Sequence, residues 1–255
     1  YPCFFSNDSF FNTSLSQSTV FLADVVDDYY ATVTNRGKKV DHRYGCSGID
    51  GVAFAPAPGL QRLLSGLVFP LGLMLVVFAG AELFTGNNAV LVPGALGRRY
   101  GWRKVLENWM LVYIGNFVGS LFFACFLVKL PGMLSAEAWR SAAVGVAEAK
   151  VSMPWLTVFL RGIGANWLVC LAVWLGLSAN DVAGRLLGLF FPIMCFVAIG
   201  YEHSVANMFF IPLGMMHDAS VTVSDFLFAN LVPATLGNIV GGAIFVGGIY
   251  WYVNK

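Results

Sequence analysis

Long runs without charged residues dominate the chain from Pro58 to its end. Asp, Glu, Lys and Arg are all absent from residues 63–81, 108–128, 186–201 and 226–254. All of these runs except 186–201 exceed the length of about 18 residues at which an apolar run becomes a candidate membrane-spanning helix. An outer-membrane barrel would instead show alternating segments of about ten residues. The pattern predicts an all-α polytopic membrane protein.

Polar interruptions divide these runs into crossings. The first crossing stops at a polar segment, residues 82–88, which a shorter apolar run follows, and another apolar stretch is interrupted at residues 200–203. We expect residues 129–154 to form an external loop with an amphipathic stretch. The predicted crossings are residues 63–81, 105–128, 155–177, 186–216 (with the interruption) and 226–253.

Charged residues set the expected orientation and the domain division. The segment 97–104 has four basic residues and no acid, so the positive-inside rule places it in the cytoplasm, together with Lys255. Arg161 lies within a crossing, where we expect it to be a structural partner at a helix interface. Residues 1–57 contain many charges and no clear span. We therefore divide the chain into a divergent N-terminal region, residues 1–57, whose first helix is not readable, and a transmembrane channel domain, residues 58–255.

Composition narrows the possible functions. Hydrophobic residues make up 58% of the 255 residues and charged residues 11%, whereas soluble domains carry about 25% charged residues. A net charge of +1 leaves no basic face for nucleic acid. The five cysteines include no Cys-x-x-Cys pair and no metal-ligand spacing, so we expect neither a metal site nor a cofactor.

Two parts of the channel domain repeat each other. The repeated positions lie 120 residues apart around the two interruptions and 122 residues apart in the following crossings. They are Gly80, Glu82 and Asn87 with Gly200, Glu202 and Asn207, and Gly115, Asn116, Val118 and Gly119 with Gly237, Asn238, Val240 and Gly241. Three elements per half, with a broken middle helix, are typical of an inverted-repeat transporter whose substrate passes at the level of the breaks.

The sequences at the two breaks carry a family resemblance. GAELFTGN at residues 80–87 and GYEHSVANM at residues 200–208 resemble the formate/nitrite transporter family, and FPLGL at 69–73, GANW at 164–167 and LGNIVGG at 236–242 follow in the same order. The resemblance runs from Pro58 to the end of the chain. It implies an aquaporin-like six-helix fold with two broken helices, in a homopentamer whose protomers each hold a pore in the inner or plasma membrane.

The resemblance also implies roles for individual residues. It marks His203 as the central pore histidine and Thr85 as the threonine of the first break. Lys150 and Asn166 match a polar pair near the outer side of the pore. We expect the Glu202 side chain to cap exposed backbone N–H groups at the second break. The apolar constrictions of the pore are expected at Phe69, Leu73, Phe84 and Phe196.

The implied function is conduction of small monovalent anions of weak acids: formate, nitrite or hydrosulfide, with acetate or lactate in some members. Formate is our first choice, because residues 206–214 look more like formate and hydrosulfide channels than nitrite channels. An isolated anion pays a large desolvation penalty in an apolar constriction, whereas a weak acid that takes up a proton crosses neutral. Lys150 would attract the anion, and His203 would hydrogen-bond or protonate it. Permeation should therefore depend on pH or on coupled protons.

Three alternatives remain open, one within the family and two of other classes. A hydrosulfide or nitrite channel is the nearest alternative within the family. An aquaporin-like channel for neutral solutes lacks support, because the paired Asn-Pro-Ala of that family is absent. An intramembrane enzyme that uses Glu202 and His203 as acid and base would need a nucleophile motif or His-Glu-x-x-His, and the chain has neither. We therefore expect a transport protein and not an enzyme.

Overall fold

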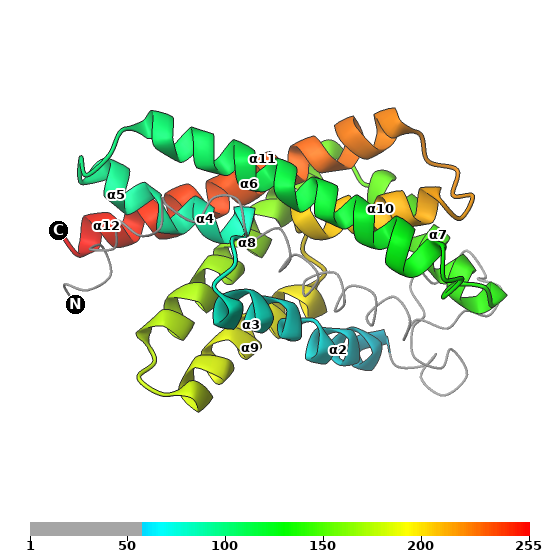
Figure 1. Ribbon diagram of the computed structural model, residues 1–255, viewed down its shortest axis with the longest axis horizontal. Helices are drawn as coiled ribbons and strands as arrows, with labels where there is room; N and C mark the ends of the chain where they lie inside the picture. Colours follow the sequence, from blue (N-terminus) through cyan, green and yellow to red (C-terminus); the bar gives the residue numbers. More distant parts are fainter. Residues whose placement is uncertain (1–57) are drawn as a thin grey trace.

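The computed structural model describes residues 58–255, and the regular elements of this part are helices (Figure 1). Predictions for residues 1–57 lie outside the described residues. The elements are α2 (Pro58–Val68), α3 (Pro70–Ala79), α4 (Phe84–Val90), α5 (Val92–Leu96), α6 (Trp102–Phe122), η3 (Phe123–Lys129), α7 (Glu137–Val151), α8 (Trp155–Ser178), α9 (Val182–Ile199), α10 (Ser204–Met215), η4 (Asp225–Leu231), α11 (Val232–Ile239), η5 (Val240–Gly248) and α12 (Ile249–Val253). Elements η3, η4 and η5 are π-helical stretches that continue the neighbouring α-helices.

Within residues 58–255, five continuous helices are long and apolar enough to cross a membrane. Their bounds agree with the predicted crossings to within a few residues, except that the run 186–216 is divided between α9 and the shorter apolar helix α10. The prediction of a polytopic helical membrane protein is confirmed. The five helices are Arg62–Ala79, Trp102–Lys129, Trp155–Ser178, Val182–Ile199 and Asp225–Val253.

Both predicted interruptions contain a four-residue break between two helices, at residues 80–83 and 200–203. The first was predicted too far along the chain: most of the polar segment 82–88 is helical and forms the start of α4, whose buried Asn and Thr side chains are polar without ending the helix. Helix α3 ends at Gly80, with φ of +69°, and helix α9 ends at Gly200, with φ of +83°. Glycine adopts this left-handed conformation without the steric cost that a Cβ atom brings, and it commonly ends helices. After three more extended residues the chain re-enters a helix, at Phe84 in the first break and at Ser204 in the second.

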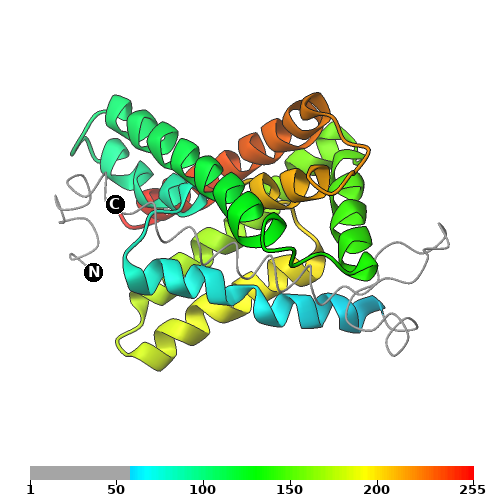
Figure 2. The ribbon, with the colours of Figure 1, turned by 45° about the vertical axis from the view of Figure 1, so that its right-hand side comes forward.

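The two helices that follow the breaks run in opposite directions. Helices α4 and α10 both begin near the centre of the molecule and extend toward opposite ends, and the same relation is visible after a turn of the view (Figures 1 and 2). This is the arrangement that an inverted repeat with two broken helices produces. It brings residues 80–85 and 200–206 together at the middle of the molecule.

The segment 129–154 is mostly helical, not mostly loop. Its amphipathic stretch is helix α7, which packs on α10 through the buried residues Ala143 and Ala147. The contact is close because small residues meet: a Cβ atom added at Gly214 would lie 2.4 Å from the Cβ of Ala147. The predicted loop lacked enough apolar residues for a crossing, but a helix that covers another helix needs only one apolar face.

The C-terminal helix and the basic segment lie at the same end of the molecule. Helix α12 contacts α5, which directly precedes the basic residues at 98–104, and both stand apart from α7 and the far end of α10 (Figure 1). The structure therefore agrees with the expectation that this segment and Lys255 share one side of the membrane.

Candidate functional site

The first break is held by a carboxylate and three asparagines. Glu82 accepts hydrogen bonds at Oε2 from Asn87 Nδ2 (2.8 Å) and Asn108 Nδ2 (3.0 Å). Asn116 Oδ1 accepts the backbone N–H of Phe84 at 3.0 Å, and its Nδ2 lies 3.5 Å from the Glu82 carbonyl oxygen. The first N–H groups of a helix lack partners within the helix, so Asn116 supplies one to α4.

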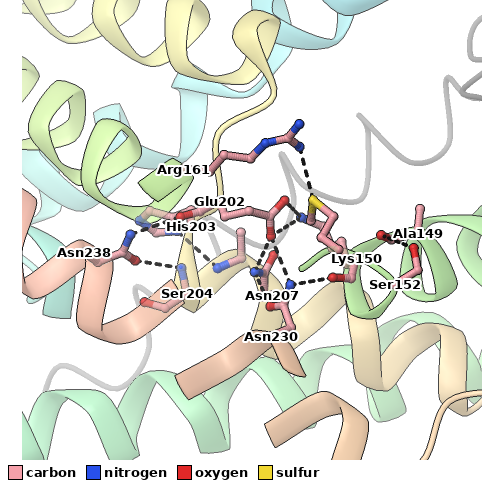
Figure 3. A network of polar contacts seen from close by, with 12 residues as sticks. Ala149, Lys150, Ser152, Arg161, Glu202, His203, Ser204, Asn207, Asn230 and Asn238 are labelled. Atoms are coloured by element: carbon pink, nitrogen blue, oxygen red, sulfur yellow. Dashed lines mark hydrogen bonds and ion pairs between the residues drawn. The ribbon is translucent and has the colours of Figure 1, made fainter. Parts of the chain in front are cut away.

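The second break repeats this arrangement with corresponding residues. Glu202 accepts at Oε2 from Asn207 Nδ2 (2.7 Å) and Asn230 Nδ2 (3.2 Å). Asn238 Oδ1 accepts the backbone N–H of Ser204 at 2.8 Å, while Asn238 Nδ2 donates to the Glu202 carbonyl oxygen at 3.0 Å. The repeat found in the sequence is therefore a repeat of hydrogen bonds, and Figure 3 shows the second copy.

A lysine distinguishes the second break from the first. Lys150, in the last turn of α7, donates to both carboxylate oxygens of Glu202 at 3.0 and 3.1 Å. The Glu202 side chain is only 5% exposed, so an unpaired charge there would be costly. Within residues 58–255, no lysine or arginine forms such a pair with Glu82. The expectation that Glu202 caps backbone N–H groups is wrong: its carboxylate bonds to side chains, and Asn238 provides the cap.

His203 uses its two ring nitrogens for different partners. The residue precedes α10, and its Nδ1 accepts the backbone N–H of Ala206 at 3.2 Å. Because Nδ1 is an acceptor there, the neutral ring carries its proton on Nε2. That nitrogen lies 2.9 Å from Thr85 Oγ1, in the first turn of α4, so Nε2–H donates to the threonine. The two breaks are thus joined at their centre, and both side chains are buried.

The two breaks differ at the position of this histidine. When they are aligned by the residues that precede α4 and α10, His203 corresponds to Leu83. Phe84 and Thr85 lie one and two residues further along, inside α4. The histidine is therefore present in one repeat only, and the first repeat has an apolar side chain in its place.

A small cavity lies beside His203. It measures about 10 Å³, which is close to the smallest space that holds one water molecule. Seven apolar residues and one histidine line it, and they come from α3, both breaks, α8, α9 and α10: Phe69, Leu73, Leu83, Val169, Ile193, Phe196, His203 and Ala206.

Three of the four expected constriction residues line this cavity. Phe69 and Phe196 meet edge to face, with ring centroids 5.3 Å apart. Leu73 lies on α3, which begins directly after Phe69. Phe84 points elsewhere: its ring packs against Tyr113 at 4.8 Å between centroids, and Leu83 takes the place in the lining. A shift of one residue at the start of α4 moves a side chain by about 100° around the helix.

Asn166 joins helices instead of meeting Lys150. Its Nδ2 donates to the carbonyl oxygens of Asn238 (2.7 Å) and Thr85 (3.1 Å) and to Asn88 Oδ1 (3.1 Å). The side chain is fully buried and is not part of the cavity lining. It therefore holds the main chain of Thr85, whose hydroxyl meets His203, and its effect on the pore is indirect.

Sequence reasoning did not assign a role to Asn108 and Asn230. These residues complete the two carboxylate networks and lie 122 positions apart, the same offset that relates Asn116 to Asn238. A search for further identities at that offset would have found them. Residues 58–255 contain no group of three or more His, Cys, Asp or Glu side chains that could hold a metal ion.

Comparison with known families and proteins agrees with this architecture. Residues 45–252 match the family model described as "Formate/nitrite transporter". A "Probable formate transporter" of Methanothermobacter thermautotrophicus is 48% identical over 217 residues, which cover 79% of each chain. "Formate channel FocA" of Haemophilus influenzae is 39% identical over 223 residues, which cover 80% of this chain and 78% of the relative.

Solved structures share the fold. An "FNT family ion channel" superposes with a TM-score of 0.80 at 27% identity, over 97% of this chain and 90% of that one. A "Pentameric formate channel with formate bound" superposes with a TM-score of 0.75 at 30% identity, over 92% of this chain and 94% of that one. The resemblance seen at the two breaks therefore extends over nearly the whole described part.

Proposed function

Because this chain belongs to the formate/nitrite transporter family, we propose that it conducts formate across the membrane through the cavity beside His203. The family assignment confirms the prediction of a multi-pass membrane transport protein and not an enzyme. The observation that supports the pathway most directly is the position of His203, which is a polar side chain among seven apolar cavity residues. An intramembrane ionisable residue is costly and usually marks a transport path.

The choice of formate as substrate is based on the similar proteins. Two similar proteins are called formate transporter and formate channel, and one similar structure holds formate in a pentamer. We propose the same substrate and a pentamer with one pore per protomer for this chain. Nitrite, hydrosulfide, acetate and lactate are small conjugate bases of weak acids too, so they belong to the same test.

The apolar lining selects for a neutral permeant. A bare anion would exchange its hydration shell for Phe69, Leu73 and Phe196, at a large electrostatic cost. The conjugate acid has no net charge to desolvate, so it passes this lining more easily. Acidification raises the fraction of the acid and should therefore raise the flux.

His203 supplies a hydrogen-bond donor beside the cavity. Its Nε2–H, which donates to Thr85, can turn to donate to an oxygen of the permeant. An imidazolium would carry a proton on Nδ1 as well, and Nδ1 would then no longer accept the N–H of Ala206. The ring thus works best as a neutral donor. We place the proton exchange of the weak acid in the aqueous mouths of the pore.

A flux panel tests the proposal. Purified protein in proteoliposomes is supplied with formate, nitrite, hydrosulfide, acetate or lactate at about pH 5.5 and about pH 7.5. We expect saturable formate uptake that is faster at the lower pH. Formate uptake no greater than in protein-free liposomes would contradict the assignment of formate. Faster uptake of another anion at equal concentration would assign that anion instead.

A further inference from the structure

An arginine stands at the level of the second break. Arg161 lies on α8, and its carbonyl oxygen accepts the backbone N–H of Glu202 at 3.4 Å. The carbonyl oxygen of the next residue, Gly162, accepts Asn238 Nδ2 at 2.8 Å. These two bonds fix the main chain of α8 beside the break. The side chain of Arg161 therefore starts from the same depth in the membrane as the carboxylate that pairs with Lys150.

The guanidinium group of Arg161 has no carboxylate partner among residues 58–255. Its Nη1 contacts the sulfur of Met153 at 3.1 Å, and the residue is exposed. Figure 3 shows this side chain extending past Glu202, on the side of the break that also holds Lys150. A sulfur atom is a weak acceptor, so most of the five N–H donors of the guanidinium are available for another ligand.

Among residues 58–255, the charges beside the second break do not cancel. Lys150 and Glu202 form a pair with two N–O contacts near 3 Å, so together they contribute little net potential to an approaching anion. Arg161 adds one positive charge beside them. A single uncompensated charge in a partly apolar surrounding attracts anions more strongly than it would in bulk water.

We infer that Arg161 is an anion-capture site at the outer mouth of the pore, and that it concentrates a small carboxylate or similar monovalent anion before the permeant reaches His203. This inference rests on the proposed function and makes it more specific. The sequence predicted that Lys150 would attract the anion, but in the structure the Lys150 ammonium forms an ion pair with Glu202. Arginine is suited to the task, because its planar donors bind two oxygens of one carboxylate.

The test compares wild type with Arg161→Gln and Arg161→Lys in proteoliposomes. Initial uptake is measured against anion concentration at low and at high ionic strength, with impermeant salt. For Arg161→Gln we expect an apparent KM about three- to tenfold higher at low salt, a smaller dependence of KM on salt, and a maximal rate within about twofold of wild type. Arg161→Lys should keep most of the low KM. Arg103→Gln, which removes an exposed arginine paired with Glu107, is the matched control.

The outcomes separate this inference from the proposed function. Wild-type uptake identifies the conducted anion, and the variants are then compared with that anion, whichever it is. Equal KM and equal salt dependence in Arg161→Gln and wild type would overturn the capture role. If Arg161→Gln does not assemble, Arg161→Met keeps the apolar stem without the charge. Failure of both neutral variants to assemble, beside a stable Arg161→Lys, would show that the charge serves the fold, which also overturns the inference.

Discussion

His203 combines a helix-capping contact and a cavity contact in one side chain. Its Nδ1 accepts a backbone N–H at the start of α10, and its Nε2 faces Thr85 and the cavity. Asparagine is among the best residues for this capping position, and it also has an N–H donor. Phenylalanine has neither an acceptor for the backbone N–H nor an N–H donor. The two substitutions therefore separate the polar functions of the residue from its bulk.

We expect His203→Asn to lower the formate flux while leaving the shape of its pH profile between about pH 5 and 8 unchanged. The reason is that, in the proposed mechanism, the proton is exchanged by the weak acid in the mouths of the pore and not by the ring, and the substitution leaves the mouths unchanged. His203→Phe should abolish flux and lose about 1 kcal/mol of stability with the cap. Flux against pH in proteoliposomes measures both. A pH profile displaced in His203→Asn would show that the ring itself is protonated during transport.

Phe196 and Phe84 make a matched pair for the constriction. Both are buried, but only Phe196 lines the cavity, and Phe84 packs on Tyr113. We expect Phe196→Ala to raise the uptake of lactate relative to formate. Phe84→Ala should leave that ratio unchanged, although it costs roughly 3–5 kcal/mol of stability as a core truncation. Competition between labelled formate and lactate reads out the ratio, and equal ratios in the two variants would contradict the assignment.

The sequence allowed some of these residues to be placed and not others. Glu82, Glu202, Asn116 and Asn238 were found through the repeat, because identical environments had kept identical side chains. The pairing of Lys150 with Glu202 joins residues 52 positions apart, and no local pattern reports such a contact. Leu83 lines the cavity where Phe84 was expected, because the lining depends on the residue at which α4 begins. A sequence pattern does not determine a helix start to within one residue.

At the level of elements, the continuous helix of α11 and η5 approaches α8 closely because glycines line the contact. A Cβ atom added at Gly241 would lie 2.3 Å from the carbonyl oxygen of Ile163, and one added at Gly237 would lie 2.2 Å from that of Phe159. Small residues four positions apart allow membrane helices to pack in this way. The contact also holds Asn238 against Gly162, so it helps to position the second break.

We expect Gly241→Ala to destabilise the protein by about 1–3 kcal/mol, since the main chain of α8 must move away. Gly145→Ala is the control: this exposed glycine of α7 has no atom within 4 Å of an added Cβ, so the change should be neutral or stabilising by up to about 1 kcal/mol. Thermal unfolding in detergent compares the two. Equal loss in both variants would mean that the helix contact is not tight.

The segment that follows α10 carries a pH-sensitive residue outside the spanning helices. His217 is buried, and burial, with the nearby charges of Lys129 and Arg140, lowers the pKa of its imidazole below the usual 6.5, although Asp218 acts in the opposite direction. The unfolded chain then binds a proton more readily than the folded protein as the pH falls below about 6.5. Acidification should therefore reduce stability.

The expected result is a melting temperature that falls between about pH 6.5 and 5 and falls less steeply in His217→Gln. Glutamine keeps a polar side chain of similar length but does not titrate. The measurement is thermal unfolding in detergent at several pH values. Parallel curves for wild type and variant would show that His217 contributes nothing to the pH dependence.

For the molecule as a whole, the runs of uncharged residues were sufficient to predict the number and order of the described crossings. Helix α7, which is not a crossing, was predicted only as a loop with an amphipathic stretch. Its Ala-rich apolar face is too narrow for a membrane-spanning helix, yet it packs on α10. The opposite directions of α4 and α10 followed from an odd number of elements per repeat. How the two breaks meet through Thr85 and His203 depended on packing between the halves, which the repeat itself does not encode.

The topology yields a test at this scale. We expect cysteines introduced at Gly101 and Lys255, in a background without the native cysteines, to react with a membrane-impermeant reagent from the cytoplasmic side only. The basic residues near 98–104 give this side, and the contact between α5 and α12 requires both positions to share it. Labelling of the two positions from opposite faces would contradict this topology.

The double use of His203 also restricts how the pore can diverge. A mutation that alters the chemistry of the cavity at this position simultaneously removes the acceptor that begins α10, so selection meets both effects in one step. Residues able to replace the cap are few, chiefly Asn, Asp, Ser and Thr, and of these only some offer a donor to a passing acid. New permeant preferences should therefore arise first at Phe69, Leu73 or Phe196, where side-chain size can change without loss of a helix start, and last at the histidine.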